Sequence, residues 1–109
     1  MAETNVYKTL YQGFLSNAEA TFATVGAGKC WIIRLITVIN TDSSTRTYTL
    51  HKNGTTAAYL IGPAACSLGA GEMDVYDEVR ACDTADYFSG LASVTNVVTV
   101  LIEGDEVTI

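Results

Sequence analysis

The chain has 109 residues and a mass of 11.6 kDa, which is the size of a single domain. Hydrophobic residues make up 49% of the sequence and charged residues 17%, whereas an intrinsically disordered chain has low hydrophobicity and high charge. The formal net charge of −6 argues against nucleic-acid binding, because nucleic-acid-binding proteins carry a basic surface. We therefore expect one globular domain over residues 1–109 that binds no nucleic acid.

The apolar segments do not have the length of a membrane anchor. The N-terminus lacks a basic region followed by an apolar stretch, so we expect no secretory signal. The longest apolar run, from Trp31 to Ile39, is interrupted by Arg34 and is much shorter than the roughly 20 residues of a transmembrane helix. We expect a buried strand in this run and no contact with a membrane.

The residue types favour β-structure along the whole chain. The sequence contains 15 Thr, 10 Val and 7 Ile, and these β-branched residues suit pleated strands. The predicted strands, in chain order, are residues 6–15, 21–25, 29–41, 46–52, 57–61, 72–76, 79–82, 87–93 and 97–102, with a β-like end at 107–109. Turn residues recur at the spacing typical of a sandwich or barrel. The sequence therefore predicts an all-β, single-domain antiparallel β-sandwich.

Two of these segments carry a stronger signal than the others. Asn53-Gly54 predicts a type I′ hairpin turn between strands 46–52 and 57–61, because that turn needs positive φ at both central residues. Strand 29–41 is apolar on both faces, although an antiparallel sheet commonly leaves one face in water. We expect this strand to be covered twice, its second cover being the N-terminal segment or a neighbouring subunit. Residues 1–15 are expected to form an N-terminal arm or an edge strand.

The sequence contains no recognisable catalytic, cofactor or metal motif. It lacks a nucleophile elbow, a zinc-protease helix and a dinucleotide-binding loop. The single histidine, His51, lies in an alternating strand, where we expect a solvated or cross-strand-paired imidazole. The three cysteines, Cys30, Cys66 and Cys82, are widely spaced, and we expect buried, reduced thiols. We therefore expect no enzymatic activity, no cofactor and no metal site.

An acidic segment is the one candidate for cation binding. Half of the twelve carboxylates lie between Glu72 and Asp86, and calcium favours oxygen ligands. The spacing is not that of an EF-hand, and Arg80 lies within the segment. A solvated acidic rim is the favoured interpretation, and a weak cation site is the alternative.

Aromatic residues near the N-terminus are the candidates for a contact surface. Tyr7, Tyr11 and Phe14 lie close to a chain end, where a protruding segment could dock onto a neighbour. Tyrosine is enriched at interfaces because it combines apolar area with a polar tip. We predict a partner interface made of these residues and of the strand that contains Trp31. Core packing and a sugar-binding platform, as in a carbohydrate-binding module, are the alternatives.

Several motifs taken in order resemble a family of phage proteins. The stretches Val6 to Gly13, Ala20 to Phe22, Val25 to Lys29 and Ile33 to Thr41 resemble the first strands of small β-sandwich virion proteins of tailed bacteriophages. Residues 68–72, Leu-Gly-Ala-Gly-Glu, resemble the loop before the next strand in these proteins. The sequence departs from the family pattern at position 26, where proline would be usual, and around residues 83–90.

This resemblance implies a jelly-roll-like fold, or alternatively an immunoglobulin-like one. It also implies a non-enzymatic virion protein that is assembled in the host cytoplasm and forms homo-oligomers. The leading expectation is a capsid decoration (cement) protein that binds the major capsid protein and stabilises the shell lattice. A structural component of the tail, neck or a fibre, bound to other virion structural proteins, is the alternative.

Overall fold

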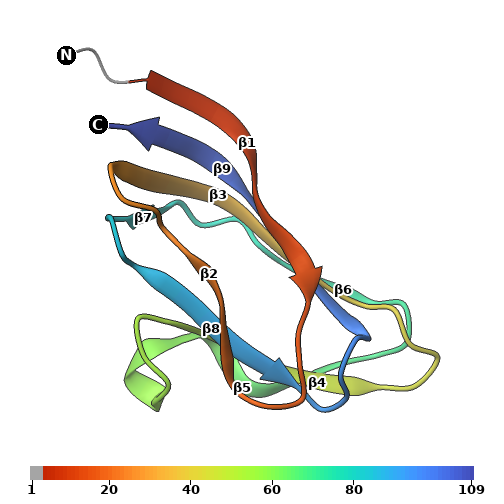
Figure 1. The fold of residues 1–109 in the computed structure, drawn as a ribbon. Coiled ribbons are helices and arrows are strands. Elements are labelled where there is room, and N and C mark those ends of the chain that lie inside the picture. The colour runs from red at the N-terminus through yellow and green to blue at the C-terminus, as the bar shows by residue number, and fades with distance from the viewer. Residues whose placement is uncertain (1–3) are drawn as a thin grey trace.

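The computed structural model describes residues 4–109 as two antiparallel β-sheets packed face to face (Figure 1). The first sheet has the order β1 (Thr4–Phe14), β9 (Val98–Thr108), β3 (Lys29–Asn40) and β6 (Met73–Tyr76), and β7 (Arg80–Cys82) also pairs with β3. The second sheet has the order β2 (Ala20–Thr24), β8 (Tyr87–Ala92), β4 (Arg46–Lys52) and β5 (Leu60–Leu68). A short 3-10 helix, η1 (Ala57–Tyr59), precedes β5. The prediction of an all-β sandwich in a single domain is confirmed.

The core lies between the two sheets and is built from alternate residues of each strand. The strands β3 and β9 contribute most of it from the first sheet, and β4 and β8 face them from the second. The fully buried side chains include Ile33, Ile36, Val38, Val98, Val100 and Ile102 from the first sheet and Tyr48, Leu50 and Phe88 from the second. Burial of this apolar surface is the main force that holds the sheets together.

Most predicted strands lie within a few residues of the observed ones, and the segment after β4 is the main exception. The strands β4 and β5 do form a hairpin, in which His51 pairs with Leu60. The predicted two-residue turn is wrong, because Asn53 has a φ of 62° but Gly54 has no positive φ. The Tyr59 ring occupies the space that a Gly54 side chain would fill. The chain therefore makes a longer loop, and Ala57–Tyr59 is a 3-10 helix and not a strand.

The last strand is longer than the sequence predicts. The acidic segment Glu103–Glu106 was expected to be a tail between β-like residues, and this expectation is wrong because β9 continues through it to Thr108. Its charges have partners, since Asp105 pairs with Arg34 at 3.0 Å and Glu106 accepts a hydrogen bond from Trp31 Nε1 at 3.1 Å. Paired charges can therefore lie inside a sheet.

The N-terminal segment is an edge strand of the first sheet. The strand β1 pairs with β9 from Thr4 to Phe14, with a bulge at Leu10. It lies beside β9 and does not cross β3, as Figure 1 shows. The predicted edge strand is thus present, but it does not supply the second cover for β3. Residues 1–3 of the predicted 1–15 segment lie outside the described residues.

Candidate interaction surface

The solvent-facing side of the first sheet is apolar, and we call it the outer face. Its cross-strand rows follow from the strand register. One row joins Phe14, Thr99, Ile39 and Met73, and the next joins Gln12, Leu101, Thr37 and Val75. Leu35 pairs with Glu103 in the middle of the sheet, and a further row joins Tyr7, Asp105, Ile32 and Ala81. Large apolar side chains therefore alternate across all strands of this face.

Within residues 4–109, no second layer lies over the outer face. Phe14, Met73 and Val75 are 51%, 56% and 52% exposed, and Ile39 and Leu101 between them are half-buried. A soluble monomer usually has no apolar patch larger than about 300–600 Å², and larger patches mark interaction sites. The strand β3 is thus apolar on both sides, as the sequence predicts, but in the single chain only its inner side is covered.

The charge on the outer face is nearly balanced. In the described strands of the first sheet, its charged side chains are Arg34, Asp105 and Glu103. Arg34 donates a hydrogen bond to Asp105 at 3.0 Å, and this hydrogen bond raises the pKa of the guanidinium. Asp105 is buried while Arg34 is half exposed. The face therefore carries little of the net charge of −6 of the chain.

The structure places the four predicted interface residues at three different sites. Tyr7 and Phe14 lie on the outer face, where they are 59% and 51% exposed. Tyr11 lies on the opposite side of the same strand and packs on Phe22, with ring centroids 5.0 Å apart. Trp31 is buried in the core. The bulge at Leu10 brings Tyr11 inward, since an extra residue reverses the direction of every side chain after it.

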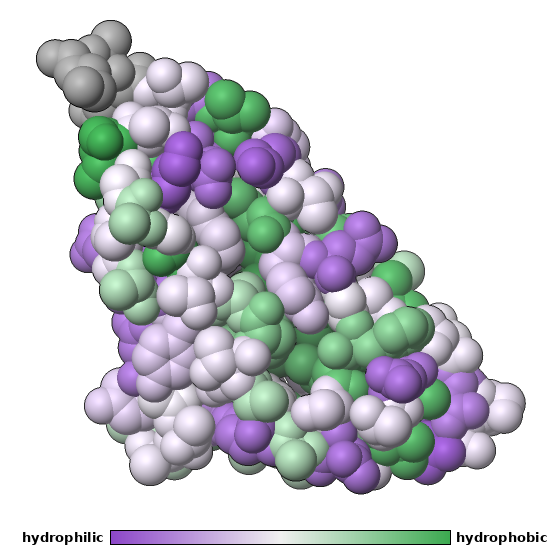
Figure 2. Space-filling model, in the orientation of Figure 1, coloured by the Kyte–Doolittle hydropathy of each residue, from purple (hydrophilic) through white to green (hydrophobic). Residues whose placement is uncertain are grey.

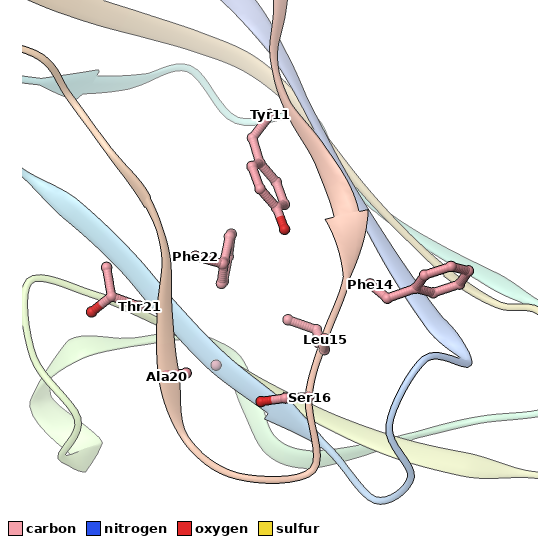
Figure 3. A pocket seen from close by; sticks show the side chains of 8 residues that line it. Tyr11, Phe14, Leu15, Ser16, Ala20, Thr21 and Phe22 are labelled. Atoms are coloured by element: carbon pink, nitrogen blue, oxygen red, sulfur yellow. The ribbon is translucent and has the colours of Figure 1, made fainter.

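A hollow of about 290 Å³ opens between β1 and β2, on the side where the two sheets are not closed by a strand. Figure 3 shows Tyr11, Phe22 and Leu15 pointing into this hollow, whereas Phe14 points away from it. Figure 2 shows hydrophobic residues gathered along the same side of the molecule. The volume of the hollow, about 290 Å³, lies just below the range of small-molecule sites, which is about 300–1,000 Å³. It is an open groove between sheet edges and not an enclosed pocket.

The exposed aromatic rings do not form a flat platform for sugar binding. Tyr7 and Phe14 lie seven residues apart on β1, and Tyr59 is in η1, next to the other sheet. A sugar-binding platform needs two or more rings side by side on one face. The geometry therefore does not support the alternative of a carbohydrate-binding module.

A buried polar cluster on the second sheet contains the only histidine of the sequence. His51 Nδ1 lies 2.7 Å from Glu19 Oε1, but the ring N–H is not aimed at the oxygen and forms no hydrogen bond. Ser89, which pairs with His51 across β4 and β8, donates to Glu19 Oε1 at 3.3 Å. A serine nucleophile would instead donate to the imidazole and would be accessible, whereas Ser89 is 1% exposed. The imidazole of His51 is itself buried and therefore not solvated, and its nearest charged neighbour, Glu19, lies outside the two strands that pair with β4.

A second polar cluster joins the two sheets at their other side. The Tyr48 hydroxyl donates to the Asp74 carboxylate at 2.5 Å and lies 2.6 Å from the Tyr76 hydroxyl. Cys66 Sγ donates to the same carboxylate at 3.4 Å. Burial raises the pKa of the Tyr48 hydroxyl and that of the Cys66 thiol, so both groups stay protonated. No local sequence pattern marks this cluster, because its members come from three separate strands.

The remaining sulfur and carboxylate groups do not converge on a site. All three cysteines in residues 4–109 are free, but Cys82 alone is fully buried, and burial raises its pKa to about 11. Glu72 accepts a hydrogen bond from Gly69 N, and Asp86 accepts one from Asp83 N. Within the described part of the chain, no three His, Cys, Asp or Glu side chains gather as metal ligands would. The acidic segment is thus divided among separate local contacts.

No family model, no curated protein and no solved structure matches the chain. Among residues 4–109, the structure contains no helix that is long and apolar enough to cross a membrane.

Proposed function

We propose that this chain is a non-enzymatic structural protein of a bacteriophage virion, namely a capsid decoration protein that binds the major capsid protein and is assembled with it in the host cytoplasm. The observation that carries the proposal is the uncovered, apolar outer face of the first sheet. A large exposed apolar face of this kind marks a site where another protein binds. The resemblance to small virion proteins gives the setting in which the chain would find its partners.

We further propose that the sandwich is a jelly roll. In that fold two Greek keys place the first strand beside the last and the second beside the last but one. The sheet orders β1-β9-β3-β6 and β2-β8-β4-β5 support this assignment when β6 and β7, which both pair with β3, are counted as one interrupted strand. An immunoglobulin fold would instead keep strands A, B, E and D in one sheet, and this order does not match.

The proposed mechanism is passive. A protein that binds neighbouring shell subunits only in the assembled lattice stabilises that lattice by mass action, and several contacts per oligomer add avidity. The acidic surface would keep free copies soluble and away from the packaged nucleic acid. The Tyr48 cluster joins three strands through its own hydrogen bonds, and the serine of the His51 cluster is buried, which supports a structural role for both clusters.

The experiment that tests the proposal is a measurement of copy number. Purified particles of the phage that encodes this chain would be analysed by quantitative mass spectrometry, with the major capsid protein as the internal standard. Hundreds of copies in a fixed ratio to the shell protein are expected for decoration. A dozen copies or fewer would replace decoration by a place in the tail, neck or a fibre, and absence from particles would overturn the virion role.

A further inference from the structure

We propose that two copies of this chain pack through their outer faces, around a two-fold axis that runs along the strands between β9 and β3. The proposal deepens the proposed function, and rests on it for the assembly in which the pair acts. Its test is made on the purified protein and needs no particle.

The size of the outer face suits a pair of copies. The face is four strands wide, at about 4.8 Å per strand, and about ten residues long, at about 3.3 Å per residue, so it spans roughly 600 Å². A standard interface buries about 800 Å² on each partner, and side chains at the rim supply the difference. The N-terminal strand does not cross this face, so a second chain has to cover it.

Rotation about this axis places each cross-strand row of one copy against the same row of the second copy, in the reverse strand order. The rotation places β1 of one copy opposite β6 of the other, because these strands are the two edges of the same sheet. Phe14 and Met73 lie at the two ends of the same cross-strand row. The Phe14 of each copy therefore meets the Met73 of the other copy, and the contact occurs two times in the dimer. Aromatic rings pack favourably against methionine sulfur. Leu101 lies on the row next to this contact and becomes buried near the axis.

The charges of the face favour the same arrangement. Arg34 is on β3 and Glu103 is on β9, one on each side of the proposed axis. The rotation brings Arg34 of each copy towards Glu103 of the other. The edge formed by β6 is followed by Asp77 and Glu78, whereas β1 has no acidic residue. An acidic rim thus lies over a rim without acidic groups, which limits the repulsion between two chains of net charge −6.

The first experiment is sedimentation equilibrium of the purified chain. We expect a dimer of twice the chain mass of 11.6 kDa at micromolar concentration. Leu101→Asp should weaken the association at least about thirtyfold, as removal of a central contact does. The matched control is Tyr59→Asp, which places the same charge at an exposed aromatic residue outside the outer face and should leave the dimer intact. A monomeric wild-type chain, or a dimer that resists Leu101→Asp, would overturn the proposal.

The second experiment tests the axis and does not depend on the folding of Leu101→Asp. Phe14→Cys and Met73→Cys are made separately, each with Cys30→Ser and Cys66→Ser, and treated with a thiol cross-linker about as long as the 10 Å between packed sheets. A mixture of the two variants should give covalent dimers, whereas each variant alone should not. The reason is that the same residue in the two copies lies roughly 17 Å apart under the proposed axis and strand spacing. Cross-linking of Phe14→Cys alone would refute this axis.

The failure of this proposal can be told apart from failure of the virion role. A monomeric chain that is abundant in particles would overturn the dimer and leave decoration standing. A dimer that is absent from particles would overturn the virion role and leave the interface standing.

Discussion

Replacement of Asn40 tests whether one buried amide holds two segments of the chain together. Asn40 ends β3 and is fully buried. Its Nδ2 group donates to the carbonyl oxygens of Ser44, Leu68 and Gly69 at 2.8, 2.9 and 3.2 Å, and its Oδ1 accepts from Asp42 N at 2.9 Å. The amide thus joins the loop after β3 to the end of β5.

Asn40→Ala removes all four contacts and leaves buried polar groups without a partner. Each such loss costs about 1 kcal/mol, and more where the group remains dry, so we expect the free energy of unfolding to fall by about 3–5 kcal/mol. At roughly 4 °C per kcal/mol for a chain of this length, Tm should fall by about 15 °C. Asn40→Asp should be at least as harmful at pH 7, because a carboxylate would face three carbonyl oxygens.

Urea unfolding followed by circular dichroism measures this effect. The matched control is Asn17→Ala, which changes an exposed loop asparagine and should alter the free energy of unfolding by less than about 0.5 kcal/mol. A loss below about 1 kcal/mol for Asn40→Ala would show that water satisfies these carbonyls as well as the amide does, and would refute the reasoning.

Three further outcomes are expected from the same assay. Tyr48→Phe should cost about 1.5–3 kcal/mol, because the Asp74 carboxylate loses its hydroxyl donor; a neutral result would mean that water replaces the hydroxyl. Gly104→Ala should cost more than about 2 kcal/mol, since a methyl group there would overlap a carbonyl of β3, whereas Gly26→Ala, whose methyl group would make an ordinary contact with Lys29 Cγ at 3.9 Å, should be neutral. The indole hydrogen bond lowers the pKa of Glu106 in the folded state, so its contribution to stability is present above the unfolded pKa of about 4.3 and is lost as the pH falls through the folded pKa. Glu106→Gln should therefore flatten the loss of stability in acid, and an unchanged acid slope would contradict this assignment.

The alternation of apolar residues was sufficient to predict the fold class. Segments such as 46–52 show a clear period of two, and the predicted bounds of β4 match the observed ones. The apolar character of both sides of β3 also follows from its sequence, because each side is read from alternate residues of one strand. These features depend on local patterns, which a single sequence contains.

The features that were missed depend on contacts between distant strands. A charged tail was predicted at Glu103–Glu106 because the partners of these carboxylates, Arg34 and Trp31, come from a strand about 70 residues earlier. The bulge at Leu10 has no turn residue to mark it, so the opposite directions of Tyr7 and Tyr11 were not predicted. The polar cluster at Tyr48 combines β4, β5 and β6 and has no local signature.

The bulge at Leu10 sets which aromatic residues of β1 lie on the outer face and which one lies in the groove. Before it, Tyr7 faces the outer face, and after it Tyr11 enters the groove while Phe14 returns to the outer face. A partner on the outer face therefore does not cover the groove between β1 and β2. In the proposed pair, both grooves stay accessible at the two sides of the dimer, and each can contact a different subunit of a shell. If the chain is the decoration protein that we propose, one dimer would then bridge two lattice positions and stabilise the shell through both contacts.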